Sequence, residues 1–190
     1  MKKKQGKLFV FSAPSGAGKT TIIKNVLKKF PELIFSVSAT TRKQRYYEIE
    51  GRDYFFLTED EFKRKIGNNE FIEWEKTYDY FYGTLRSFVS ENVEKGKSVV
   101  LEVDVKGALK IKESYPDSVL IFITPPSIEE LKKRLANRKT ETDMDFRKRI
   151  ERAKMELSFN DKFDYNVVNE NLKEAENQVF EIIKNELKEQ

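Results

Sequence analysis

The residues best suited to chemistry stand near the start of the chain, in the stretch Ala13–Thr20, which reads APSGAGKT. It matches the phosphate-binding pattern G-x-x-x-x-G-K-[ST] at every fixed position except the first, where alanine replaces glycine. Gly16 and Gly18 allow backbone N–H groups to converge on phosphate oxygens. Lys19 can reach the β- and γ-phosphates of a nucleotide, and the Thr20 hydroxyl can ligate Mg²⁺. The predicted nucleotide-binding loop comprises Ala13, Pro14, Ser15, Gly16, Ala17, Gly18, Lys19 and Thr20.

The segments on either side of this loop support the prediction. The apolar run before it is typical of a buried strand, and Thr20–Phe30 suits a helix, which is the order that a phosphate-binding loop requires. The alternative is a glycine-rich turn with an exposed lysine. That alternative is disfavoured because strand, spacing, lysine and threonine all occur together.

Other short apolar runs, rich in β-branched and aromatic residues, predict further buried strands. With the first run, the predicted strands occupy residues 7–13, 33–40, 97–104, 118–124 and 164–169. Helices are predicted at Thr20–Phe30, Thr84–Lys95 and Ser127–Arg138. Ser127 with Glu130 forms a capping-box pattern, and Asn171 with Glu174 is a weaker signal for the start of a last helix. Alternating strands and helices predict an α/β fold with a mostly parallel, covered sheet.

Two stretches break this alternation. Residues 42–83 contain two strand-like segments and a short helix opened by Thr58 and Glu61, and they predict an inserted, antiparallel subdomain. Residues 138–150, RKTETDMDFRKRI, are charged and lack core residues before Phe146, which indicates a mobile surface lobe.

The composition excludes several kinds of chemistry. The 190 residues include neither cysteine nor histidine, so disulfides, thiolate catalysis and imidazole-based catalysis or metal binding are excluded. The 36 basic and 32 acidic residues are interspersed, so no nucleic-acid surface is singled out. The apolar run at Leu8–Phe11 is too short for a signal peptide, and no stretch is long enough to span a membrane. We expect a single cytoplasmic domain, a monomer or a homodimer, that binds neither nucleic acid nor membrane.

The phosphate-binding loop does not by itself select a reaction. A switch GTPase would need an Asn-Lys-x-Asp segment, which the chain lacks, and a motor ATPase would usually be larger. Downstream, the stretches SVSATTRKQRYYEIEGRDYFF, NNEFIEWEKTYDYFYGT and VVLEVDVKGA make the chain resemble guanylate kinases over essentially its whole length. The resemblance implies a three-layer P-loop kinase fold with a parallel central sheet. It also implies transfer of the γ-phosphoryl group of ATP, bound with Mg²⁺, to GMP, giving GDP and ADP.

The resemblance also assigns residues to the GMP site. The implied GMP-binding residues are Ser38, Arg42, Arg45, Tyr54, Glu73, Tyr82, Thr84, Glu102 and Asp104. Ser38, Glu73 and Thr84 hold family positions that read the base, whereas Arg42, Arg45, Tyr54 and Tyr82 hold positions that contact the GMP phosphate. Guanidinium forks and phenol donors are well suited to a phosphate dianion. Taken singly, each of these side chains is more typical of surface charge or packing.

The same resemblance divides the chain and completes the site. It implies a core of residues 1–33 and 85–190, a GMP-binding lobe at about 34–84 and a lid at about 138–149. Arg138 and Arg149 match lid-side arginines, and with Lys19 and Arg42 they are the expected catalytic residues, while Asn169 lies in an adenine-side block. The chain departs from the family pattern at QRYYE, where prolines and a glycine are usual, and at Lys139 of the lid.

Two alternatives remain open at this stage. One is a non-catalytic guanylate-kinase-like binding module, which would be expected to lack Lys19 or the phosphate-binding arginines Arg42 and Arg45. The other is a P-loop kinase for another nucleoside monophosphate or a sugar phosphate, against which Ser38, Glu73 and Thr84 argue.

Overall fold

A computed structural model describes residues 5–77, 79–136 and 143–188 of the chain. Its central sheet is parallel and five-stranded, with the strand order β2-β7-β1-β8-β9. The strands are β1 (Leu8–Ser12), β2 (Ile34–Phe35), β7 (Val99–Glu102), β8 (Val119–Thr124) and β9 (Tyr165–Val168). Every residue of β1 and β8 is buried, as expected for strands covered on both faces. The α/β fold with a parallel central sheet is therefore confirmed.

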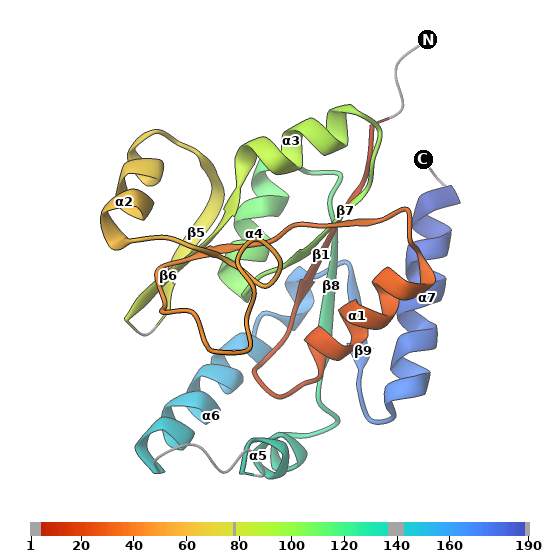
Figure 1. The fold of residues 1–190 in the computed structure, drawn as a ribbon. Helices are drawn as coiled ribbons and strands as arrows, with labels where there is room; N and C mark the ends of the chain where they lie inside the picture. The colour runs from red at the N-terminus through yellow and green to blue at the C-terminus, as the bar shows by residue number, and fades with distance from the viewer. Residues whose placement is uncertain (1–4, 78, 137–142, 189–190) are drawn as a thin grey trace.

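Helices cover both faces of this sheet and make it the middle of three layers (Figure 1). One face packs against α1 (Lys19–Lys29) and α7 (Leu172–Lys188), through residues such as Ile22 and Val179. The other packs against α3 (Arg86–Glu94) and α4 (Val105–Ser114), through Val89 and Ile111. None of the helices among the described residues combines the length and the apolar character needed to cross a membrane.

A second sheet of four strands stands beside the first, at the left of Figure 1. In the order β4-β3-β6-β5, its strands are Phe55–Phe56, Ala39–Thr40, Tyr80–Leu85 and Phe71–Thr77. Helix α2 (Glu59–Gly67) covers it, and the buried ring of Phe62 stacks on Phe71 at 4.3 Å and on Phe81 at 5.4 Å between centroids. Thr58 and Glu61, which were predicted to open this helix, form a capping box at its start. Strand β4 pairs parallel to β3, and the remaining pairs are antiparallel.

Two helices, α5 (Ile128–Ala136) and α6 (Asp143–Leu157), lie at the bottom of Figure 1. They pack together through a small apolar cluster made of Leu131, Leu135, Phe146, Ile150 and Ala153. The Ser127 hydroxyl accepts the expected capping bond from the Glu130 N–H at 3.0 Å. A 3₁₀ turn at Asn160–Lys162 then leads into β9.

Several element predictions differ from the structure. The single strand predicted at 33–40 is two short strands, because Ile34–Phe35 pair with β7 of one sheet and Ala39–Thr40 pair with β4 and β6 of the other. Thr84 does not begin a helix, because it pairs with Glu73 in the second sheet and α3 begins at Arg86. These segments connect the two sheets, so neither periodicity nor capping residues alone reveal where each element ends.

Two helices lie where none is predicted. Helix α4 follows β7 directly, with Asp104 as its N-cap. Helix α6 begins at Asp143, inside the charged stretch that was expected to be a mobile surface lobe. Residues 137–142 lie outside the described residues. From Phe146 onward, however, apolar side chains recur every three to four residues and bind this helix to α5.

Candidate active site

A cleft of about 490 Å³ opens where the carboxyl ends of β1 and β7 face the second sheet. This edge is where open α/β sheets bind their ligands. Most predicted site residues line it, from the loop before α1, from the second sheet and from α6. They are Ala13, Pro14, Ser15, Gly16, Gly18, Lys19, Thr20, Ser38, Tyr54, Glu73, Tyr82, Glu102, Asp104 and Arg149.

The phosphate-binding loop has the backbone conformation that its glycines predict. Gly16 and Gly18 adopt left-handed φ angles of 92° and 96°, which glycine takes without the penalty that other residues incur. Gly18 is the N-cap of α1, and the Ala17 N–H donates to the Pro14 carbonyl at 3.1 Å. The buried Ala17 faces the core rather than the cleft. The N-terminus of α1, which carries the positive end of the helix dipole, therefore lies at the cleft.

Lys19 and Thr20 meet at Glu102, the last residue of β7. Lys19 Nζ lies 2.8 Å from Glu102 Oε1, and Thr20 Oγ1 donates to the same oxygen at 2.7 Å. Burial by itself would raise the pKa of Glu102, but the Lys19 ammonium and the two hydrogen bonds outweigh it and hold that pKa below its ordinary value. An ionised carboxylate and a hydroxyl are thus paired beside the phosphate-binding loop.

Asn169, at the carboxyl end of β9, lies behind this loop rather than in the cleft. Its side chain is 5 % exposed, and its Nδ2 donates to the Ala17 carbonyl at 2.7 Å. A Cβ atom on Gly18 would collide with the same amide group. Arg134 of α5 donates to the Asn169 carbonyl at 3.1 Å. The side-chain amide therefore braces the backbone of the phosphate-binding loop.

We expect Asn169→Ala to raise KM for ATP about tenfold, because the buried Ala17 carbonyl loses its partner at a cost of ~1–3 kcal/mol. The melting temperature should fall as well. Steady-state kinetics and thermal melting check both effects. Asn166→Ala is the matched control, since Asn166 is an exposed residue of the same strand. An unchanged KM for ATP alongside a lowered melting temperature would mean that the brace serves stability alone.

Glu73 is a buried carboxylate on β5, 6 % exposed. Thr84 Oγ1, from the neighbouring strand β6, donates to Glu73 Oε1 at 2.6 Å. The pKa of Glu73 is raised to about 7, chiefly by burial. The hydrogen bond from Thr84 opposes this rise, the charge of Asp104 adds to it more weakly, and Lys110 lowers the pKa slightly. One oxygen is thus committed to Thr84. The other faces the first turn of α4, where a Cβ on Gly107 would lie 2.8 Å from it.

The predicted phosphate-binding arginines lie on the segment between β3 and β4. Arg42 makes a two-pronged ion pair with Glu48, with N···O distances of 2.7 and 3.1 Å, and it lies over the Tyr54 ring at 5.4 Å. That ion pair holds the pKa of Glu48 below its ordinary value. Burial raises the pKa of Tyr54 to about 12, so its phenol stays a neutral donor. Tyr54 and Tyr82 are in edge contact, with centroids 6.2 Å apart.

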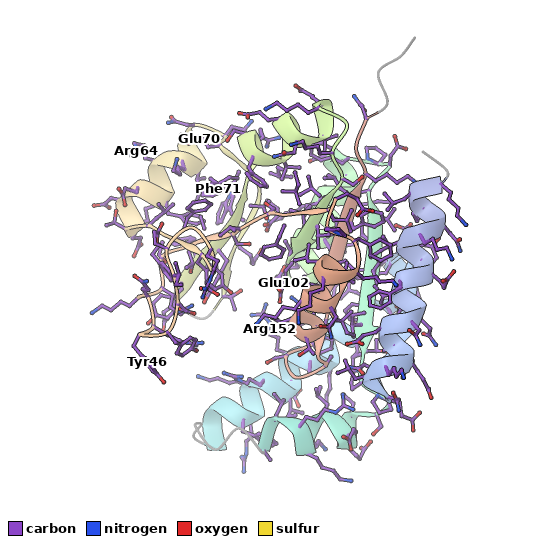
Figure 2. All side chains as sticks on the ribbon, turned by 45° about the vertical axis from the view of Figure 1, so that its right-hand side comes forward. Tyr46, Arg64, Glu70, Phe71, Glu102 and Arg152 are labelled. Carbon is purple, nitrogen blue, oxygen red and sulfur yellow. The ribbon has the colours of Figure 1, made fainter. Side chains whose placement is uncertain are left out.

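Arg45 lies at the outer end of the same segment. Its guanidinium donates to the Tyr47 hydroxyl at 3.0 Å, and its backbone N–H donates to Glu48. Tyr46 is fully exposed and lies at the edge of the molecule in Figure 2, far from the labelled Glu102 and Arg152 near the centre. Neither Arg42 nor Arg45 is therefore among the residues that line the cleft, although Arg42 contacts Tyr54, which is.

The structure adds residues that the sequence did not single out, and it leaves one prediction outside its reach. Arg152 and Glu156 of α6 line the cleft together with Arg149. Arg152 follows Arg149 by three residues, so helical spacing would have placed both on one face had α6 been predicted. Arg138 lies outside the described residues.

Comparisons with known proteins agree with this geometry. The family model described as guanylate kinase matches residues 5–186. The guanylate kinase of Thermotoga maritima is 50% identical over 182 residues, which cover 96% of this chain and 88% of that protein. That of Clostridium acetobutylicum is 46% identical, covering 95% and 86%.

A solved structure matches the fold as well. The crystal structure of guanylate kinase from Anaplasma phagocytophilum superimposes with a TM-score of 0.78 at 34% identity, covering 97% of this chain and 87% of that one. A phosphate-binding loop and a buried carboxylate thus share one cleft in a chain that resembles these guanylate kinases over nearly its whole length. The chain belongs to the guanylate kinase family and is an ATP:GMP phosphotransferase.

Proposed function

We propose that the two ends of the cleft hold the two nucleotides, with the ATP phosphates on the loop Ala13–Thr20 and GMP against the second sheet. The observation that supports this most directly is the single cleft that joins Lys19 and Thr20 to the buried Glu73. In this arrangement the segment at about 34–84 is the GMP-binding lobe. The segment at about 138–149, with Arg138 and Arg149, is the lid.

Mg²⁺ fits the oxygen donors at the ATP end. Thr20 Oγ1 and Glu102 Oε1 lie 2.7 Å apart beside the loop, and hydroxyl and carboxylate oxygens are ligands that Mg²⁺ prefers. When bound, Mg²⁺ would offset phosphate charge as the phosphoryl group transfers. The release of Glu102 would free Lys19 to contact the β- and γ-phosphates. Asn169 acts at this end by holding the loop in shape.

The GMP phosphate would bind Arg42, Arg45, Tyr54 and Tyr82. Glu48 occupies the fork of Arg42, so it acts as the counter-ion that holds this guanidinium over the ring of Tyr54, a residue of the cleft. A phosphate dianion accepts charge-assisted hydrogen bonds strongly and binds arginine in a similar two-pronged geometry. The phenol hydroxyls of Tyr54 and Tyr82 complete the donor set.

The guanine base would bind Glu73, with help from Ser38, Thr84 and Asp104. Guanine presents N1–H and the N2 amino group as adjacent donors, and a carboxylate has lone pairs for both. Thr84 orients the Glu73 carboxylate from the neighbouring strand. Phosphoryl transfer then needs positioning and charge neutralisation more than covalent help. Lys19 and the lid arginines would supply the neutralisation, and closure of the lobe and lid would exclude water.

A coupled assay of ADP formation over GMP, AMP, CMP, UMP and dGMP tests this function. We expect GMP to give a kcat/KM at least about a hundredfold above that of AMP, because mismatched buried hydrogen-bonding groups each cost ~1–3 kcal/mol. Activity should disappear when EDTA removes Mg²⁺. Comparable rates with AMP and GMP would contradict the proposed role of the Glu73 pocket.

A further inference from the structure

Arg152 stands between two acidic side chains on the α6 wall of the cleft. Its Nη2 donates to Asp104 Oδ2 at 3.0 Å, and its Nε donates to Glu156 Oε1 at 2.8 Å. Glu156, one turn later on α6, is 5 % exposed, and its pKa is raised chiefly by that burial. Figure 2 shows Arg152 near the centre of the molecule. This guanidinium therefore links α6 to the end of β7.

Asp104 is held on two sides as a result. Its Oδ1 accepts the backbone N–H of Gly107 at 2.8 Å, as the N-cap of α4, and its Oδ2 accepts Arg152. The first bond fixes Asp104 to its own helix, and the second fixes the plane of the carboxylate relative to α6. Without Arg152, rotation about the side chain could turn Oδ2 away from the cleft while the capping bond remained.

Asp104 and Glu73 converge on the same turn of α4. A Cβ on Gly107 would lie 2.8 Å from Glu73 Oε2 and 3.3 Å from Asp104 Oδ1, so both carboxylates approach this glycine from the cleft. The charged groups that act on Glu73 are Asp104 and Glu75, which disfavour its ionisation, and Lys110, which favours it. Two neighbouring carboxylates repel each other, and a cation paired with one of them lessens the repulsion.

We propose that Arg152 is a positioning residue for guanine recognition, which acts by fixing and partly neutralising Asp104 beside Glu73. This inference rests on the proposed function, in which Glu73 and Asp104 read the base. It also gives α6, the helix that continues from the lid, a direct contact with the base pocket. The competing role for Arg152 is to neutralise charge on the phosphoryl group during its transfer, as proposed for Arg149. The two roles predict opposite kinetics.

The test compares Arg152→Gln and Arg152→Lys with Lys154→Gln, a change at an exposed basic residue of the same helix beyond the proposed lid. For Arg152→Gln we expect KM for GMP to rise about tenfold, with kcat and KM for ATP within about threefold of wild type. Arg152→Lys should recover part of the GMP affinity. The pH at which GMP affinity is half lost should move upward in Arg152→Gln, because Asp104 then repels an ionised Glu73 more strongly. Lys154→Gln should change none of these quantities.

A double variant separates positioning from other effects. Asp104→Asn keeps a capping side chain but removes the charge, so adding Arg152→Gln to it should raise KM for GMP no further. Loss of folded protein lowers the apparent kcat but does not alter KM, so reduced stability cannot mimic the expected result.

Three outcomes would overturn the inference: a fall in kcat with unchanged KM for GMP, unchanged kinetics throughout, or full additivity in the double variant. Failure of the proposed function itself would appear separately, as unchanged GMP selectivity in Glu73→Gln.

Discussion

Lys19→Ala is expected to lower kcat about a thousandfold, since removal of one preorganised charge or donor at a transition state typically costs about 10²–10³ in rate. Lys19 is well placed for that role, because its ammonium lies at the phosphate-binding loop and, among the hydrogen bonds described, contacts only the Glu102 carboxylate. KM for GMP should change little, because most of the proposed GMP-binding residues belong to the second sheet and the segments that connect its strands. Steady-state kinetics with GMP as acceptor measure both quantities.

The fold should survive this change. Lys19 belongs to none of the apolar clusters, and Glu102 keeps its hydrogen bond from Thr20. Lys28→Ala provides the control, because Lys28 is an exposed residue in the last turn of the same helix. A correctly folded Lys19→Ala protein with near-normal kcat would show that the lysine only balances the charge of Glu102.

The ATP end of the site could be predicted from sequence because its parts are local. The strand, the loop and the first turn of α1 are contiguous, and the glycines needed for left-handed backbone stand at fixed spacing. The partner of Lys19 is different, because Glu102 is 83 residues away and reaches the loop only through the pairing of β1 with β7. A carboxylate at a strand end indicates a site edge but not which cation it meets.

The side of the cleft formed by α6 could not be predicted, because the helical spacing of apolar residues is not evident in the sequence of α6. Charged residues dominate the first turns, while the apolar contacts of Phe146, Ile150 and Ala153 need α5 to complete them. Because the helix was not predicted, the sequence could not indicate that Arg152 lies on the same side of it as Arg149. It could not indicate the pairing of Arg152 with Asp104 either. Tertiary contacts, rather than intrinsic propensity, decide such helices.

The segment between β3 and β4 shows a different limit. The resemblance implies that Arg42 and Arg45 bind the GMP phosphate, but it does not indicate which residues hold the two side chains in place. Glu48 holds Arg42 by two hydrogen bonds, and Tyr47, which stands at a departure from the family pattern, accepts a bond from Arg45. Counter-ions of this kind follow from the geometry of the segment and not from its residue types.

Glu73→Gln should have the second large effect, a loss of about a hundredfold in kcat/KM for GMP with little change in KM for ATP. Glutamine keeps an oxygen for the Thr84 hydroxyl but sets an amino group against a guanine donor, and each hydrogen bond lost to a charged group is worth about 1.5–3 kcal/mol. Adenine presents N1 as an acceptor and so offers the carboxylate one donor, its N6 amino group, where guanine offers two. Selectivity for GMP over AMP should therefore shrink. Glu70→Gln, three residues earlier and half-buried outside the cleft, is the matched control.

The role of Glu73 should also be visible in the pH dependence of KM for GMP. With the pKa of Glu73 near 7 in the free protein, the ionised form that accepts both guanine donors disappears as pH falls below that value. KM for GMP should therefore rise toward low pH in the wild type. The dependence should be absent from Glu73→Gln, whose amide does not titrate.

The stability of the protein should change with pH in the opposite direction to its affinity for GMP. This difference distinguishes a buried carboxylate that binds guanine from a surface charge. The pKa of Glu73 is higher in the folded protein than the ordinary 4.5, so the unfolded chain loses this proton first and the free energy of unfolding decreases as pH rises from about 4.5 to 7. A shift of that size corresponds to roughly 3 kcal/mol above pH 7. Glu73→Gln avoids this penalty, so it should melt at a higher temperature than wild type at pH 8 and at nearly the same temperature at pH 4.5. If Glu73→Gln loses activity with GMP and gains stability only at high pH, the buried carboxylate serves ligand binding at a cost in stability. Equal melting curves at pH 8 together with unchanged selectivity would instead place guanine recognition elsewhere in the cleft.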